Sequence, residues 1–222
     1  MGSVFYTAAK AAFAIPRFAA IRERVFGMEH VPARGPFILA VSHLSHLEPF
    51  FVGALVRPHV RWMSRIEFYR PRVAAAFLNA MDAFPVDRFG NASPAVRTAV
   101  RILERGGAVG MFPEGGVAVG RESVLRGGAV KQGVCTIAIQ AQTAVVPVVV
   151  LGTDALLAVR PWLPIKSGRV DVSFGPSIQP PRRDGRSRRA LRAEMAGTLT
   201  AAFVDLYRDL LRRTGRRDED VP

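Results

Sequence analysis

The chain has 222 residues, of which 49% are hydrophobic and 22% charged, and it carries a formal net charge of +13. This composition excludes an intrinsically disordered chain, and the length suits one domain with a sizeable core. A single cysteine, Cys135, excludes an internal disulfide and a cysteine metal cluster. The excess of arginine suits anionic lipid surfaces, phosphorylated substrates or nucleic acid, and does not by itself choose among them.

The N-terminal part of the chain mixes aromatic and charged side chains. Residues 4–26 hold four phenylalanines but also five charged residues. These charges interrupt every window of the roughly 20 apolar residues that a membrane-spanning helix needs. We therefore expect residues 1–26 to form an amphipathic segment that contacts a bilayer interface, with an ordinary helix packed on the domain as the alternative. Residues 27–222 are then expected to form a single domain.

Short apolar runs alternate with helical patterns along the rest of the chain, after a turn-rich stretch at residues 25–35. The apolar runs predict strands at residues 37–41, 61–64, 83–86, 108–112, 144–151 and 170–174. Helices are predicted at residues 45–55, 73–80, 93–105, 130–141 and 186–213. This alternation predicts an α/β fold with a mixed, mostly parallel central sheet flanked by helices. Ligand sites in such folds lie beyond the carboxyl ends of the strands.

A Ser-His-Leu-Ser-His-Leu-Glu-Pro sequence at residues 42–49 directly follows the first predicted strand. It places His43 five positions ahead of Glu48, and a histidine held by a carboxylate is a general base for a hydroxyl nucleophile. A structural interpretation is also open, because Ser45 and Glu48 fit the capping box of a helix start. We interpret the other histidines as structural or surface residues; they are His30, His46 and His59.

Three further motifs follow along the chain. A Phe-Pro-Val-Asp-Arg sequence at residues 84–88 ends in an arginine, whose guanidinium can bind phosphate oxygens in pairs. A Met-Phe-Pro-Glu-Gly-Gly sequence at residues 111–116 combines a predicted strand end with glycines, whose consecutive N–H groups can form an anion-binding nest. A Val-Val-Pro-Val sequence lies at residues 145–148. Taken singly, these motifs fit a surface arginine, a plain turn and a buried strand.

Together and in this order, the motifs resemble those of the glycerolipid acyltransferases, the family of 1-acylglycerol-3-phosphate acyltransferases. The resemblance runs from about residue 26 to residue 152. It implies an enzyme that acylates a lipid hydroxyl, with an acyl-CoA or acyl-ACP thioester as co-substrate and with no cofactor or metal. His43 would be the general base and Glu48 its partner. The family usually has aspartate at the second position, so Glu48 keeps the charge on a longer side chain.

The resemblance also implies the residues that bind the acceptor. Arg88 would bind its phosphate, and Glu114, Gly115 and Gly116 belong to the motif that helps to bind its glycerol phosphate. The family usually continues this motif with Thr-Arg, whereas this chain has Gly116-Val117. The arginine of the motif is therefore missing.

Other basic residues are candidates for the missing contact. Arg121 or Arg126 could replace the motif arginine from the following loop, and Lys131 is in register with the family's stretch that leads into the next helix. Six arginines between residues 182 and 192 could bind anionic lipid headgroups or coenzyme A phosphates, or could form a solvated helix face. Nucleic acid is not expected as a partner, because no reader motif accompanies these arginines.

The acceptor that the resemblance implies is a lysophospholipid, with 1-acyl-sn-glycerol 3-phosphate as the default and phosphatidic acid as the product. Glycerol 3-phosphate and a glycolipid stay open as acceptors, and so does a catalytically silent lipid-binding protein, because of the unusual Glu48. Lipid substrates without a predicted membrane span imply a peripheral protein on the cytoplasmic face of the cell membrane.

Overall fold

The computed structural model describes residues 21–156, 158–159, 163–164, 167–182 and 184–222. In this part of the chain, a seven-stranded sheet has the strand order β1-β9-β6-β2-β5-β3-β4. Its strands are β1 (Ile21–Phe26), β2 (Phe37–Val41), β3 (Val60–Arg65), β4 (Phe84–Val86), β5 (Ala108–Met111), β6 (Val145–Leu151) and β9 (Gly168–Phe174). A small antiparallel pair consists of β7 (Ala158–Val159) and β8 (Leu163–Pro164).

Five neighbouring strands of the large sheet are parallel: β6, β2, β5, β3 and β4. Strand β9 is antiparallel to β6, and β1 is parallel to β9. The sheet is therefore mixed and mostly parallel, which confirms the predicted fold class. All five parallel strands end at the same edge of the sheet, and this edge carries the sequence motifs.

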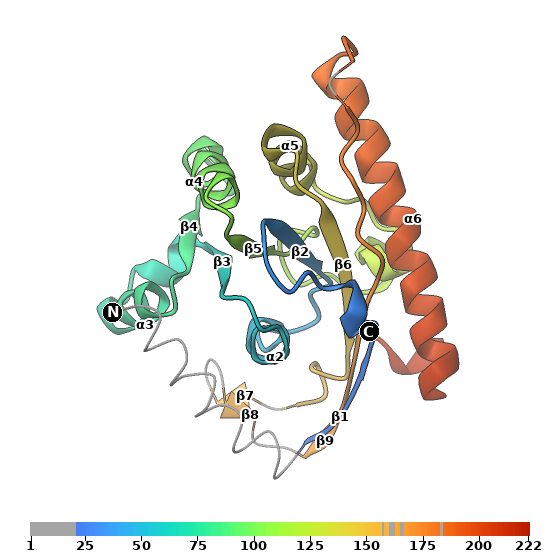
Figure 1. The fold of residues 1–222 in the computed structure, drawn as a ribbon. Coiled ribbons are helices and arrows are strands. Elements are labelled where there is room, and N and C mark those ends of the chain that lie inside the picture. Colours follow the sequence, from blue (N-terminus) through green and yellow to red (C-terminus); the bar gives the residue numbers. More distant parts are fainter. Residues whose placement is uncertain (1–20, 157, 160–162, 165–166, 183) are drawn as a thin grey trace.

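The helices are α2 (Glu48–Leu55), α3 (Arg72–Ala80), α4 (Ser93–Glu104), α5 (Gln132–Ala141) and α6 (Arg188–Thr214). Helices α4, α5 and α6 cover one face of the sheet and α2 covers the other (Figure 1). Each of the predicted strands and helices is present, with ends that differ by a few residues. None of the helices in the described residues is both long enough and apolar enough to cross a bilayer.

Strand β2 is covered on both faces of the sheet, which explains why its sequence is continuously apolar. Ile38 and Ala40 face the core that α4, α5 and α6 cover, whereas Phe37, Leu39 and Val41 face the core that contains Phe51 of α2. All five strand residues are fully buried. A central parallel strand that is covered on both faces needs apolar side chains at every position, and this strand leads directly into the His43 motif.

The N-terminal boundary of the domain differs from the prediction. Residues 21–26 form the edge strand β1, paired with β9 from Ile21↔Gly168 to Phe26↔Ser173, and are not the end of an amphipathic segment. The Ile-Arg-Glu-Arg-Val-Phe sequence has no clear strand pattern of its own, so its conformation depends on pairing with a strand almost 150 residues later. Residues 1–20 of the predicted membrane-contacting segment lie outside the described residues.

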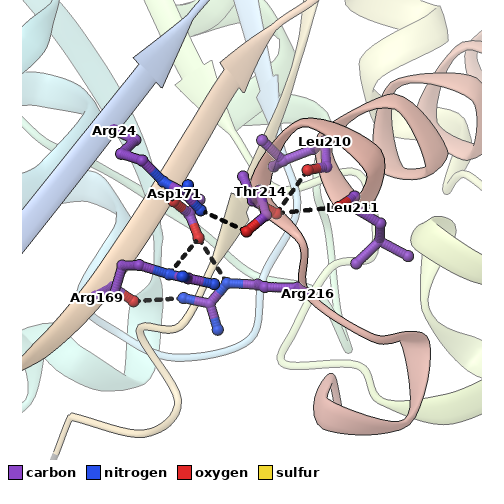
Figure 2. Close-up of polar contacts among 7 residues, drawn as sticks. All are labelled: Arg24, Arg169, Asp171, Leu210, Leu211, Thr214 and Arg216. Atoms are coloured by element: carbon purple, nitrogen blue, oxygen red, sulfur yellow. Dashed lines mark hydrogen bonds and ion pairs between the residues drawn. The ribbon is translucent and has the colours of Figure 1, made fainter.

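A buried carboxylate ties β1, β9 and the end of α6 together (Figure 2). Asp171 of β9 is fully buried, and its oxygens accept hydrogen bonds from Nε of Arg24 at 2.7 Å and Nε of Arg216 at 2.6 Å. Nε of Arg169 lies 3.3 Å away. Burial raises the pKa of Asp171, but the hydrogen bonds from Arg24 and Arg216 outweigh it and hold the pKa below its usual range. This cluster fixes β1 to the sheet.

Candidate active site

Each of the five parallel strands leads into one residue of the candidate site. His43 follows β2, Arg65 ends β3, Arg88 follows β4, Glu114 follows β5 and Thr153 follows β6. The first four line one cavity of about 1650 Å³. Thr153 donates a hydrogen bond to Glu48, which in turn contacts His43. The site therefore lies beyond the carboxyl ends of the strands, as ligand sites in α/β sheets do.

The two predicted catalytic residues are in contact. Nδ1 of His43 lies 3.1 Å from Oε2 of Glu48, the first residue of α2. Glu48 is fully buried, and His43 is 7% exposed where it lines the cavity. Because Nδ1 faces the carboxylate, Nε2 is the ring nitrogen that is left to exchange a proton with a substrate. The pair therefore has the arrangement of a general base and its orienting carboxylate.

The second carboxylate oxygen of Glu48 is held by three donors. Oε1 accepts hydrogen bonds from the backbone N–H of Ser45 at 2.7 Å, the N–H of Leu44 at 3.3 Å and the hydroxyl of Thr153 at 2.6 Å. These three donors fix the plane of the carboxylate. Thr153 was not predicted as a site residue from the sequence. Its place just after the strand that contains Val-Val-Pro-Val could have identified it, because the parallel strands end at the edge that carries the site.

The capping box is formed only in part. Glu48 accepts from the N–H of Ser45, as in that motif, but the helix begins at Glu48 and the Ser45 hydroxyl accepts from the N–H of Leu47 at 3.1 Å. Glu48 therefore makes both contacts, because Oε1 shapes the turn before α2 and Oε2 lies against Nδ1 of His43.

Aromatic rings hold the imidazole in place. Phe112 stacks on His43 with ring centroids 3.9 Å apart and planes inclined by 20°. Trp62 of β3 stacks on the same phenylalanine, with centroids 5.6 Å apart. His43 is thus packed on a ring while its Nδ1 is hydrogen-bonded, and both contacts limit its rotation.

Glu114 links the two main motifs and does not point a free carboxylate at a substrate. Its Oε2 accepts a 2.7 Å hydrogen bond from the N–H of His43, and its Oε1 accepts from the hydroxyl of Ser123 at 2.9 Å and the N–H of Val124 at 3.0 Å. Burial raises the pKa of Glu114, and these hydrogen bonds oppose the rise. The carboxylate therefore positions the backbone at His43, and its predicted contact with substrate stays a prediction.

The glycines of the same motif bring the backbone close to Arg88. Gly115 has φ of +73°, a left-handed conformation that favours glycine. A Cβ atom added to Gly116 would lie 3.1 Å from an Nη atom of Arg88. Arg88 thus lies directly against Gly116 at the cavity.

The Nε atom of Arg88 is buried, and it has no hydrogen-bond partner among the described residues. Burial lowers the pKa of Arg88, nearby Arg65 lowers it further, and Glu67 opposes this. A cavity guanidinium whose Nε has no partner among the described residues is suited to an anionic ligand group.

The other predicted basic residues differ in their placement. Lys131 lines the cavity and precedes α5, with its N–H bonded to the carbonyl oxygen of Pro113 at 2.8 Å. Arg121 is exposed and lies outside the cavity lining. Arg126 as a substrate ligand is wrong, because its guanidinium donates to the carbonyl oxygens of Asp218, Val221 and Pro222.

Two residues that line the cavity, His46 and Arg65, were not predicted as site residues from the sequence. His46, interpreted as structural or surface, lines the cavity with its ring centroid 5.5 Å from that of His43. Burial lowers the pKa of His46, and the charges of His43 and Arg65 lower it further, while Glu48 opposes them. Arg65 lines the cavity as well.

His30 is structural as predicted, since its Nδ1 bonds with the carbonyl oxygen of Phe174 at 2.8 Å.

Most of the cavity wall away from His43 is apolar. It is formed by α2, β3, the 3-10 turn η2 (Ile66–Tyr69) and α3. Its large apolar side chains include Phe50, Trp62, Phe68, Phe77, Leu78 and Met81. A volume of about 1650 Å³ with this lining suits a long apolar ligand.

Comparisons with known proteins show the family of this chain. The family model described as Acyltransferase matches residues 22–151. The 1-acyl-sn-glycerol-3-phosphate acyltransferase of Bacillus subtilis (strain 168) is 29% identical over 93 residues, which cover 41% of this chain and 47% of that protein. The protein of the same name from Streptococcus pneumoniae (strain ATCC BAA-255 / R6) is 26% identical over 144 residues, which cover 64% and 50%. The chain thus spans about half the length of these relatives.

A solved structure has the same fold. The crystal structure of the 1-acyl-sn-glycerophosphate (LPA) acyltransferase PlsC from Thermotoga maritima matches with a TM-score of 0.64 at 19% identity, over 97% of this chain and 81% of that chain. The family model covers more than half of the chain and includes every motif from His43 to Val-Val-Pro-Val, which confirms the resemblance found in the sequence. The chain therefore belongs to the Acyltransferase family.

Proposed function

We propose that this protein transfers a fatty acyl group from an acyl-CoA or acyl-ACP thioester to the free hydroxyl of a lysophospholipid, with 1-acyl-sn-glycerol 3-phosphate as the acceptor. The observation that carries the proposal is the His43–Glu48 pair, at 3.1 Å, on an apolar cavity that also contains Arg88. The names of the two bacterial relatives support the same acceptor.

The chemistry follows from the placement of His43. Nε2 of His43 takes the proton of the acceptor hydroxyl while the hydroxyl oxygen attacks the thioester carbonyl carbon. The new C–O bond gives a tetrahedral oxyanion, and its collapse breaks the C–S bond. The leaving thiolate takes the proton from the imidazolium, so that free thiol and acylated lipid are released and His43 is neutral again. Glu48 stabilises the transient imidazolium through Nδ1.

The acceptor and the acyl chain would occupy different parts of the cavity. The phosphate of the acceptor would bind to Arg88 beside Gly116, because that guanidinium lacks a carboxylate partner at Nε among the described residues. The acyl chain would lie along the apolar wall of α2 and α3. Lipid substrates require access from a bilayer, so we place the protein at a membrane surface as a peripheral protein, on the cytoplasmic face.

The test is acyl transfer from one labelled acyl-CoA to a panel of acceptors: 1-acyl-sn-glycerol 3-phosphate, glycerol 3-phosphate and a glycolipid. We expect His43→Ala to lower the rate by about 10²–10⁴-fold while the protein stays folded. His59→Ala is the matched control, because His59 is partly exposed and does not line the cavity. Wild-type rates in folded His43→Ala would refute the mechanism, and a protein that binds these lipids without turnover would be a silent lipid-binding protein.

A further inference from the structure

In the part of the chain that the structure describes, the large exposed apolar side chains lie in or next to the lining of the cavity. Among the described residues, the large hydrophobic side chains that are exposed have exposed fractions from 38% to 84%; they are Ile66, Phe68, Val73, Phe89, Val117 and Val119. Phe68, Phe89 and Val117 line the catalytic cavity. The other three lie within two residues of a residue that does. These six residues are called the apolar rim below.

The apolar rim comes from three segments that are separate in sequence. Ile66, Phe68 and Val73 belong to η2 and the start of α3, Phe89 follows β4, and Val117 and Val119 follow the Glu114 motif. Single exposed apolar residues scattered over a surface are ordinary, whereas a group of them around one opening marks a binding surface. The two most exposed members are Val73 at 84% and Phe89 at 83%.

The charge around the apolar rim distinguishes between possible partners. Between residues 65 and 73, three arginines face one glutamate, while Asp87 and Arg88, and likewise Arg121 and Glu122, balance each other. The rim is therefore mainly apolar and only weakly basic. An acidic protein partner would be recognised by a dense cationic surface, whereas a bilayer accepts apolar side chains with interspersed arginines that reach the headgroups.

We propose that the apolar rim docks on a lipid bilayer, with its side chains in the interfacial region of one leaflet and the mouth of the cavity open to the lipid. This surface is distinct from residues 1–26, the segment expected from the sequence to contact the membrane. The inference rests on the proposed function for the lipid nature of the acceptor, and it explains how a lipid hydroxyl reaches the buried His43 without crossing water.

The chain itself offers a clean way to label this surface. Cys135 is fully buried, and burial raises the pKa of its thiol to about 11, so it resists thiol reagents in the folded protein. Val73→Cys and Val119→Cys place a reactive thiol on the rim outside the cavity lining. Ala201→Cys, at an exposed position of α6, is the matched control.

Each full-length variant is labelled with an environment-sensitive fluorophore and mixed with phosphatidylcholine vesicles, with or without phosphatidylglycerol. We expect a blue shift and quenching by a lipid-borne quencher at both rim positions, and neither effect at position 201. Labels on the rim that stay in water while the protein cosediments with vesicles would overturn the proposal. So would a wild-type protein that binds neither kind of vesicle, or rim labels that are shielded by acyl carrier protein instead.

A second measurement uses the triple variant Ile66→Ser, Val73→Ser, Val119→Ser. These residues do not line the cavity, so turnover of a water-soluble short-chain donor and acceptor should stay unchanged. Partitioning to vesicles should fall by about tenfold or more, because three apolar side chains no longer leave water. Unchanged partitioning would count against the rim. Inserted labels in a protein without acyl transfer would support the docking surface and refute only the proposed function.

Discussion

The hydroxyl of Thr153 donates a 2.6 Å hydrogen bond to Oε1 of Glu48, and neither residue is exposed to solvent. Thr153 follows β6 and Glu48 begins α2. The contact therefore joins two segments at the edge of the sheet where the parallel strands end, 105 positions apart in the chain. Because Oε2 of the same carboxylate lies against Nδ1 of His43, Thr153 would act on this proposed base through Glu48. It is a positioning residue for the proposed reaction.

Removing the hydroxyl tests this role. We expect Thr153→Val to lower kcat by about tenfold to a hundredfold, because a hydrogen bond to a charged group contributes about 1.5–3 kcal/mol. Thr153→Ser keeps the donor and should restore most of kcat. Both variants should have similar melting temperatures. Equal loss of kcat in both would show that the residue acts through packing and not through the hydrogen bond.

The length of the Glu48 side chain makes a second prediction. Glu48→Gln should be severely impaired, because an amide does not stabilise the imidazolium of His43. Glu48→Asp, the residue usual in the family, should keep part of the activity because it keeps the negative charge. Some activity should be lost because the shorter side chain reaches His43 and Thr153 less well. Steady-state kinetics of the purified variants would check this order, and full activity of Glu48→Gln would contradict it.

Arg88 should act on the phosphate of the acceptor. Arg88→Ala should raise KM for a phosphorylated acceptor much more than KM for the thioester, since guanidinium–phosphate contacts are charge-assisted. Arg121→Ala is the matched control, because Arg121 is exposed and outside the cavity lining. If Arg88→Ala affected both substrates equally, or if Arg121→Ala had the same effect, Arg88 would not be the phosphate ligand.

The Asp171 cluster predicts how stability depends on pH. The pKa of Asp171 is lowered in the folded protein, so its contribution is fully present above the unfolded value of about 3.9 and is lost as the pH falls through the lower folded pKa. Asp171→Asn should lower the free energy of unfolding at pH 7 by about 3 kcal/mol, the low end for a buried ion pair, because Arg24 and Arg169 are partly exposed.

Denaturant titrations at pH 7 and below pH 4 would measure both effects. Asp209→Asn is the control, because Asp209 pairs with Arg212 and Arg213 on the surface of α6 and should contribute less than about 1 kcal/mol. A difference between wild type and Asp171→Asn that did not shrink at low pH would contradict the assignment of the effect to this carboxylate.

The sequence by itself determined the order of the strands and helices from β2 to α6, apart from the short β7 and β8, because continuous apolar runs and helical periodicity are local patterns. It also determined the His43–Glu48 pair, since five positions between a strand and a helix start are few enough for direct contact. The resemblance to the family placed Arg88 and the Glu114 motif in the site, and the cavity contains both.

Only the tertiary structure decided which residues share the site across long separations. Thr153 and Arg65 come to the cavity region because five parallel strands end at one edge, and strand order is set by packing and pairing rather than by any local pattern. The same reason explains β1, a charged sequence that becomes a strand only beside β9. It also explains Arg126, whose guanidinium meets the carbonyl oxygens of Asp218, Val221 and Pro222, 92 to 96 positions away along the chain, in place of a substrate.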